Sequence, residues 1–197
     1  MNGRVVPKGT GTPALPDLWQ AMLNGDEQAL ATLFRLHYAM LFNYGMKIIP
    51  RRDLVKDSIQ DLFVYLWEKR RTISPVHSVQ AYLLACLRRR LMTAAEAERK
   101  TRHAARELNS GAEMVVFSAE DLIIERREHA ARSARLQQAL HKIPSRMYEA
   151  LYLKKFQGLS YDEISEIMKV TPQVAKNYVF EAVKRLRQML NIPDLST

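Results

Sequence analysis

The chemistry that the sequence suggests most directly is hydrogen bonding to DNA bases by one end of a C-terminal helix. Apolar residues within 172–187 recur at steps of four, three and four, which defines a helix face turned inward. The inward residues are Ala175, Val179, Ala182 and Leu186. The outward residues near the start of this helix are then Gln173, Lys176, Asn177, Phe180 and Glu181. Lys and Asn can hydrogen-bond base edges or phosphates, and Phe can contact a thymine methyl group.

Two helix-start signals predict how this surface is positioned. Ser160 and Glu163 have the spacing of a capping box, so a short helix should begin at Tyr161. Thr171 is a suitable N-cap for a second helix, and Pro172 a favoured first helical residue. Two helices joined by a short turn are typical of a helix-turn-helix, whose second helix enters the major groove.

The same pattern also fits a simple helical hairpin with a solvated polar face. The basic residues at the end of the segment favour DNA, since they are spaced for phosphate contact. These residues are Lys184, Arg185 and Arg187.

A second basic cluster begins with Arg88, Arg89 and Arg90. Consecutive residues fan around a helix, so at most two of them can face one DNA backbone. Arginines also suit the negative end of a helix dipole, which leaves a solvated helix end as an alternative. Further basic residues follow within 99–106, and they favour phosphate binding.

A polar face is predicted on the helix over 53–69. Asp57, Gln60 and Asp61 lie on one side with Glu68, opposite the apolar residues of the same helix. The apolar residues are Ile59, Leu62 and Leu66. By itself such a face is most often only solvated.

The helical spacing of the apolar residues predicts an all-α protein of two small helical domains. The 197 residues are 47% hydrophobic, and no useful strand-like alternation occurs. We expect a disordered tail at 1–16, domains at 17–100 and 121–192, and a flexible acidic linker at 101–120, since charge switches there from basic to acidic. The net charge of +9 favours a polyanionic partner.

No residue pattern points to catalysis, a metal or a cofactor. The five histidines lack metal-ligand spacing, and there is no Gly-rich phosphate loop. Cys86 lies in an apolar run and is expected to be a small core residue. No membrane span or signal peptide is expected, which predicts a cytoplasmic protein without membrane insertion.

The segment 142–187 resembles region four of bacterial extracytoplasmic-function sigma factors, which recognises the minus-thirty-five promoter element. The similarity rests on "GLSYDEISEIMKVT" and the closing "LR". It implies DNA contacts by eight residues: Thr171, Gln173, Lys176, Asn177, Phe180, Glu181, Lys184 and Arg187. Lys169 stands where the family turn usually has Gly, and Val174–Ala175 replace the usual Thr-Val.

The segment "DLVKDSIQDLFVYLWEK" is similar to the part of sigma region two that docks on the clamp helices of the polymerase largest subunit. The resemblance implies polymerase contacts by Asp57, Gln60 and Asp61. The following loop, 73–80, and the next helix then correspond to the part that melts and holds the minus-ten element. The candidate residues there are His77, Ser78, Gln80, Tyr82, Arg88, Arg89 and Arg90. Arg89 replaces a usual Asn, and His77 could equally be a loop residue without a role.

The resemblance implies a transcription initiation factor whose partners are core RNA polymerase, promoter DNA and an anti-sigma factor. It also implies that the acidic linker follows the RNA-exit path of the polymerase, although an inert spacer is the alternative. Two other classes stay open at this point. A stand-alone helix-turn-helix regulator would form dimers and bind duplex DNA without polymerase, and a nucleic-acid-modifying enzyme would need an active site that the sequence does not suggest.

Overall fold

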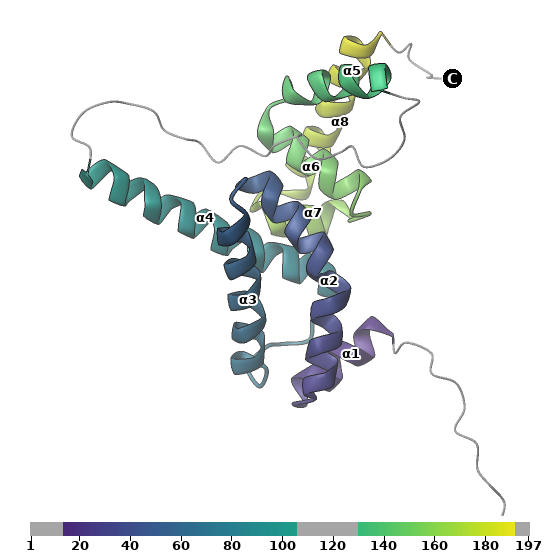
Figure 1. The fold of residues 1–197 in the computed structure, drawn as a ribbon. Helices are drawn as coiled ribbons and strands as arrows, with labels where there is room; N and C mark the ends of the chain where they lie inside the picture. The colour runs from purple at the N-terminus through teal and green to yellow at the C-terminus, as the bar shows by residue number, and fades with distance from the viewer. Residues whose placement is uncertain (1–13, 106–129, 192–197) are drawn as a thin grey trace, which may run out of the picture.

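The protein is built from α-helices throughout the part that the structure describes. The computed structural model describes residues 14–105 and 130–191, and every regular element in those ranges is a helix (Figure 1). The helices fall into an N-terminal group of four and a C-terminal group of four. The all-α class with two helical domains, predicted from the sequence, is confirmed. The expected linker lies mostly outside the described residues.

The N-terminal group consists of α1 (Leu15–Leu23), α2 (Glu27–Ile48), α3 (Arg52–Lys69) and α4 (Val79–Ala105). Helix α2 begins after Asp26, whose carboxylate acts as the N-cap and accepts hydrogen bonds from the backbone N–H groups of Gln28 and Ala29. It packs against α1, α3 and α4. Helix α2 supplies the core side chains Leu33, Leu41 and Tyr44.

A close helix approach in this group depends on a residue without a side chain. Gly45 of α2 faces α3, and a Cβ atom there would lie 2.7 Å from Cγ1 of Val55. Val55 is fully buried, as is the neighbouring Leu91 of α4. A glycine is unfavourable inside a helix by about 1 kcal/mol relative to alanine, so its presence here is explained by this tight crossing.

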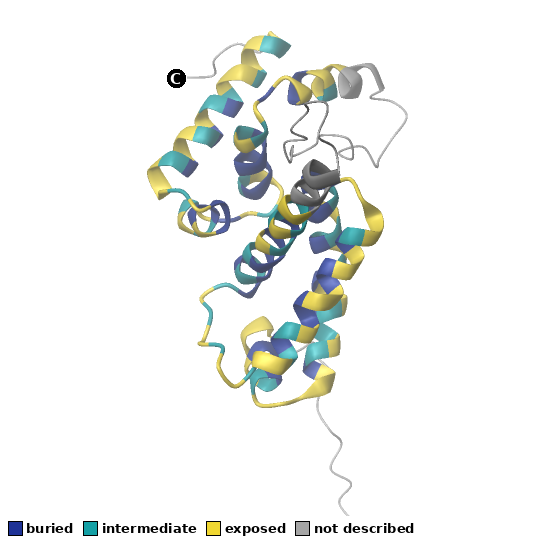
Figure 2. Ribbon diagram, turned by 90° about the vertical axis from the view of Figure 1, so that its left-hand side faces the viewer, coloured by how far each residue is buried: buried dark blue, intermediate teal, exposed yellow. Residues whose placement is uncertain are grey.

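The C-terminal group consists of α5 (Ala130–His141), α6 (Ser145–Lys155), α7 (Tyr161–Met168) and α8 (Pro172–Leu190). Helix α6 lies at its centre and packs against α7 and α8. Six consecutive residues of α6, 148–153, are buried, so this helix is covered on all sides over more than a turn (Figure 2). Helix α8 packs on α5, α6 and α7 and keeps one long face exposed.

The two groups touch each other directly. Helix α4 of the first group packs against α7 of the second, and the views of Figures 1 and 2 agree on this arrangement. The first half of α4 is therefore enclosed between α2 and α3 on one side and α7 on another.

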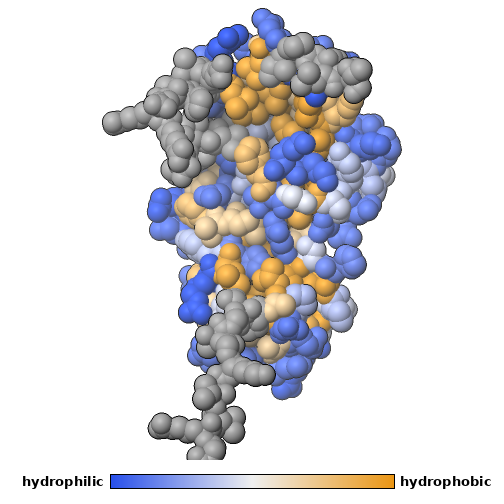
Figure 3. All heavy atoms as spheres, turned by 90° about the vertical axis from the view of Figure 1, so that its right-hand side faces the viewer, coloured by the Kyte–Doolittle hydropathy of each residue, from blue (hydrophilic) through white to orange (hydrophobic). Residues whose placement is uncertain are grey.

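Hydrophilic and hydrophobic side chains share the surface of the face displayed in Figure 3. Figure 3 shows that the hydrophobic surface on the displayed face is divided into patches by hydrophilic side chains. Six large apolar side chains are exposed among the described residues: Leu15, Leu36, Val64, Leu136, Phe156 and Phe180. Two of them, Val64 and Phe180, lie on surfaces to which the sequence assigns binding.

Candidate nucleic-acid interface

The turn before α8 is fixed by local hydrogen bonds that the sequence predicts. The Ser160 hydroxyl accepts from the backbone N–H of Glu163 at 3.2 Å, and the Glu163 carboxylate accepts from the Ser160 N–H at 2.7 Å. This capping box starts α7 at Tyr161, as expected. Ile164 and Ile167 are buried, so α7 has a single inward face.

Lys169 ends α7 in a left-handed conformation, with φ 54° and ψ 55°. Its N–H donates to the carbonyl of Ser165. A left-handed residue after a helix is usually glycine, because a side chain there costs about 1 kcal/mol or more. The departure from the family pattern at this position therefore keeps the usual turn geometry and adds backbone strain.

Helix α8 starts as predicted, with Thr171 as N-cap and Pro172 as the first helical residue. The Thr171 hydroxyl accepts a hydrogen bond from the Val174 N–H at 3.3 Å. Ala175, Val179 and Ala182 are buried against the rest of the C-terminal group. The small side chains of the two alanines allow α8 to pack tightly on α6 and α7.

The opposite face of α8 carries exposed side chains at the N-terminal end. Gln173, Lys176 and Asn177 are exposed, and Phe180 keeps 66% of its surface accessible. The Gln173 side-chain amide donates to the Asn177 side-chain oxygen at 2.9 Å, which orients both amides. The Asn177 amide nitrogen is left as a hydrogen-bond donor for a base acceptor.

The rest of the predicted set on α8 continues along this face. Glu181 is half-buried, while Lys184 and Arg187 are exposed one and two turns further on. The set thus forms one continuous strip of base-reading types followed by basic types. The spacing suits a helix that enters a groove with its N-terminal end and holds phosphates with its later turns.

The segment 73–80, predicted as a loop, ends in the first two residues of α4 and lies beside the C-terminal group in this structure. The Ser78 hydroxyl accepts from the Ala81 N–H at 3.2 Å and so starts α4. The Gln80 side-chain amide donates to the backbone carbonyl of Gln157 at 3.1 Å and to its side-chain oxygen at 3.2 Å. His77 is exposed. One side of the predicted minus-ten surface is therefore covered by the α6–α7 loop.

The pKa of Glu163 reflects the proximity of α7 to the segment before α4. Partial burial acts to raise the pKa of its carboxyl, but hydrogen bonds from Ser160 and from the Ser78 hydroxyl, with the charge of His77, outweigh this effect. The net result is a pKa below the ordinary 4.5. The capping residue of α7 thus also contacts the N-terminal group.

The three consecutive arginines of α4 point in three different directions around the helix, as predicted for neighbouring residues of a helix. Arg89 is exposed, and the Arg90 guanidinium lies 5.2 Å from the centre of the Tyr65 ring. Arg88 is buried and bonds Glu149 of α6. The DNA contact predicted for Arg88 thus requires the two helix groups to separate, and it stays a prediction.

Tyr82, the predicted aromatic of this surface, is half-buried. Its ring meets Trp19 of α1 edge-on, with the ring centres 5.6 Å apart. Desolvation, together with the neighbouring Cys86, raises the pKa of Tyr82 to about 12, so its hydroxyl is protonated at neutral pH. Cys86 is buried as expected, and desolvation raises the pKa of its thiol as well.

The predicted polymerase-binding residues form a separate surface on α3. Asp57, Gln60 and Asp61 are exposed, while Ile59 and Leu62 on the other side of the helix are fully buried. Val64 continues the exposed strip one turn after Gln60, with half of its surface accessible. The surface therefore combines two carboxylates with an exposed apolar side chain.

Sequence reasoning missed two residues that hold the two groups together, Glu149 and Tyr44. A signal for Glu149 was present, because it is the one carboxylate in the apolar stretch "YEALYL". A charge buried in such a helix needs a partner. Tyr44 of α2 is buried in the core, and its hydroxyl donates to Glu149 at 2.7 Å.

The described residues contain no group of three or more His, Cys, Asp or Glu side chains that could hold a metal ion. None of the described helices is long and apolar enough to cross a membrane.

The C-terminal helix group matches a known protein family. Residues 133–186 match the family model of sigma-70, region 4. This stretch includes most of α5, all of α6 and α7, and most of α8, so the exposed strip of α8 belongs to a DNA-binding helix-turn-helix. A comparison with curated protein sequences found no significant match.

Solved structures match the fold of both helix groups. The sigma factor RpoE from Bartonella quintana, solved with the anti-sigma factor NepR, has 18% sequence identity and a TM-score of 0.59. The match covers 85% of this chain and 99% of that chain. CnrH, solved with the cytosolic domain of CnrY, has 18% identity and a TM-score of 0.58, covering 91% of this chain and 98% of that chain.

The family match assigns residues 133–186 to sigma-70 region 4, and the structural matches show that the chain shares the fold of sigma factors. The resemblance of the C-terminal segment to sigma region four, found in the sequence, is therefore confirmed.

Proposed function

We propose that this protein is a transcription initiation factor that binds core RNA polymerase and directs it to a promoter. In this proposal the helix-turn-helix α7–α8 recognises the minus-thirty-five element, and the N-terminal group recognises and melts the minus-ten element. The observation that carries the proposal is the exposed strip of Gln, Lys, Asn and Phe side chains on α8, within a segment that matches sigma-70 region 4.

The recognition of the minus-thirty-five element follows from the order of side chains along α8. Lys176, Asn177 and Phe180 are placed near the N-terminal end, where a recognition helix reaches base edges. Lys184 and Arg187 lie further along and hold phosphates. Mutation of the first set should change sequence preference, whereas mutation of the second should weaken binding to all sequences alike.

Recognition of the minus-ten element is assigned to the loop over 73–80 and the start of α4. An unpaired base extruded from the duplex loses stacking, and it needs polar partners and an aromatic surface to compensate. His77 and Gln80 supply polar groups, Tyr82 the nearest aromatic ring, and Arg89 an exposed charge for the backbone.

The exposed face of α3 is assigned to polymerase. Asp57 and Asp61 would pair with basic residues of the clamp helices, and Gln60 lies beside them on the same side of α3. Val64 adds apolar area to the same surface. Such a factor leaves the chemistry to the polymerase, acts in the cytoplasm where core polymerase resides, and has no enzymatic activity of its own.

An anti-sigma factor is proposed as a further partner. The support is that RpoE, which has this fold, was solved with an anti-sigma factor.

Capture of core polymerase and promoter-dependent run-off transcription test the proposal together. The tagged protein should retain the core subunits from a bacterial extract, and the purified complex should initiate at a defined promoter where core alone does not. The alternative is a stand-alone helix-turn-helix regulator. Tight binding to duplex DNA as a dimer, with no retention of core subunits, would establish that alternative and exclude the proposal.

A further inference from the structure

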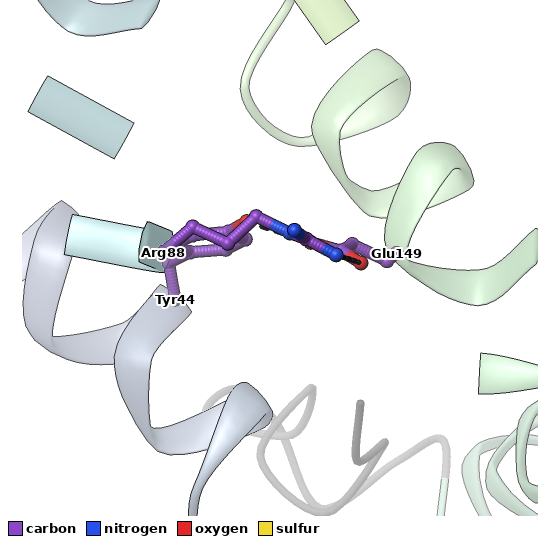
Figure 4. Close-up of polar contacts among 3 residues, drawn as sticks. All are labelled: Tyr44, Arg88 and Glu149. Carbon is purple, nitrogen blue, oxygen red and sulfur yellow. Dashed lines mark hydrogen bonds and ion pairs between the residues drawn. The ribbon is translucent and has the colours of Figure 1, made fainter. Parts of the chain in front are cut away.

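The contact between the two helix groups is centred on a buried arginine–carboxylate pair. Arg88 Nε lies 2.7 Å from Glu149 Oε1, and Nη2 lies 3.2 Å from Oε2, so the pair is bidentate (Figure 4). The two side chains are only 10% and 4% exposed. The Tyr44 hydroxyl donates to the same Glu149 oxygen at 2.7 Å, and in Figure 4 Tyr44 and Arg88 approach Glu149 from the same side.

Other contacts surround this pair and join the same two groups. The ring of Tyr44 stacks on that of Tyr152 with centres 6.3 Å apart, and the Lys47 ammonium lies 5.6 Å from the centre of the Tyr152 ring. At the other end of the contact, Gln80 bonds Gln157. The contact therefore extends from α2 across the first turns of α4.

The pair joins an acidic group to a residue of the type that binds phosphate. A guanidinium presents parallel N–H donors that fit a carboxylate and a phosphate equally well. Arg88 lies beside Arg89 and Arg90, next to the surface assigned to the minus-ten element. A carboxylate such as that of Glu149 and a backbone phosphate can therefore use the same N–H donors of Arg88.

We propose that Glu149 acts as an internal substitute for a DNA phosphate, so that the contact between the two helix groups is a latch with which single-stranded DNA competes. In the closed arrangement described here, Arg88 is covered and Gln80 is engaged. When the groups separate, Arg88 and the start of α4 become available to the nucleic acid. This inference rests on the proposed function only in its assignment of Arg88 to DNA; the latch itself stands on the observed contacts.

The physical chemistry of buried ion pairs makes such a latch reversible. Removing both charges from water offsets much of their attraction, so a buried pair contributes little net stability over the two separated, hydrated ions. Loss of only one partner is different, because the other charge is then buried without compensation in the closed arrangement. Neutralising either residue should therefore favour separation.

Förster resonance energy transfer between dyes on the two helix groups reports whether the groups are in contact or separated. Dyes are attached at Lys56→Cys in α3 and Gln188→Cys in α8, two exposed positions, in a Cys86→Ala background. Glu149→Gln and Arg88→Gln should both lower the transfer efficiency relative to the parent. Glu166→Gln is the matched control, since it removes the same charge from an exposed position of α7 and should leave the efficiency unchanged. Helical circular dichroism of each variant verifies that it remains folded.

Binding of a short single-stranded DNA separates the two roles of the pair. Glu149→Gln should bind about tenfold more tightly than the parent, which corresponds to about 1.4 kcal/mol, and clearly more tightly than Glu166→Gln. Arg88→Gln should open the latch equally but gain no affinity, because the phosphate partner has been removed. Saturating single-stranded DNA should itself lower the transfer efficiency of the parent.

The outcomes that overturn the inference are distinct. Unchanged transfer efficiency in Glu149→Gln excludes the latch, whereas opening without a gain in DNA affinity excludes the phosphate substitution. Equal gains in DNA affinity in Glu149→Gln and Glu166→Gln would show that only the net charge matters, which also excludes the phosphate substitution. Capture of core polymerase by the parent protein is scored separately, so that the proposed function can fail while the latch stands, or the reverse.

Discussion

Phe180 gives the sharpest test of the recognition surface, because its side chain is large, apolar and exposed. Full burial of a Phe side chain stabilises a fold by about 1.5–3 kcal/mol, and Phe180 has only about a third of its surface covered. Replacement by alanine should therefore remove no more than about 1 kcal/mol of packing. The better helix propensity of alanine offsets about half of that. The free energy of unfolding should therefore fall by no more than about 0.5 kcal/mol.

Binding to promoter DNA should respond quite differently to Phe180→Ala. If the ring packs on a thymine methyl group in the major groove, its loss should cost about 1–3 kcal/mol, or about 5- to 150-fold in affinity. Urea unfolding and fluorescence anisotropy with a selected minus-thirty-five duplex measure the two effects on the same preparation. Val179→Ala is the matched control. The Val179 side chain neighbours Phe180 but is buried, so this variant should destabilise the fold.

Substituting deoxyuridine for thymine removes only the methyl group and identifies the contact. At one position of the element the parent protein should lose affinity on this substitution, and Phe180→Ala should lose none. Additive effects of the two changes at every thymine, or undiminished DNA binding by the variant, would refute the assigned role of the ring.

Four further outcomes are expected. Asp61→Arg should lower core-polymerase affinity by about 2–5 kcal/mol while leaving thermal unfolding unchanged, since it sets like charges against a basic partner; undiminished binding would exclude the α3 surface, and unfolding would make the residue structural. Gly45→Ala should lower the free energy of unfolding, measured by urea titration, by about 1–3 kcal/mol, because the new Cβ would lie 2.7 Å from Cγ1 of Val55. A stabilised variant would contradict the close approach of α2 and α3. Lys169→Gly should raise the free energy of unfolding by about 1 kcal/mol by relieving the left-handed strain, and a loss of stability in the same titration would show that the lysine side chain stabilises the turn. Because the pKa of Glu163 is lowered in the folded state, its charge stabilises the fold above pH 4.5, and this stabilisation is lost as pH falls through the folded-state pKa. The difference in free energy of unfolding between the parent and Glu163→Gln should therefore vanish on acidification, and a difference that persists below that pH would show that the charge is not the cause.

Much of the fold could be predicted because its signals are local. The caps Asp26, Ser160 and Thr171 act within three residues of chain, so residue type and spacing suffice to place the helix starts. The inward face of α8 follows from the helix period alone, and exposure of the opposite strip follows from it. The order of side chains along that strip is likewise a property of the sequence.

The pairing of the two helix groups could not be predicted in the same way. Arg88 and Glu149 are 61 residues apart, and Tyr44 and Glu149 are 105 apart, so no periodicity connects them. The sequence indicated that a charge lay in an apolar stretch of α6, but not which partner would meet it. For the same reason helix periodicity does not explain Gly45, which is required by the close approach of Val55 from α3. Side-chain direction and helix starts are therefore determined by the sequence, because they depend on neighbours within a turn or two. Only the tertiary structure decided that Arg88 is buried against Glu149, because long-range packing, not helix period, sets which charges are removed from water together.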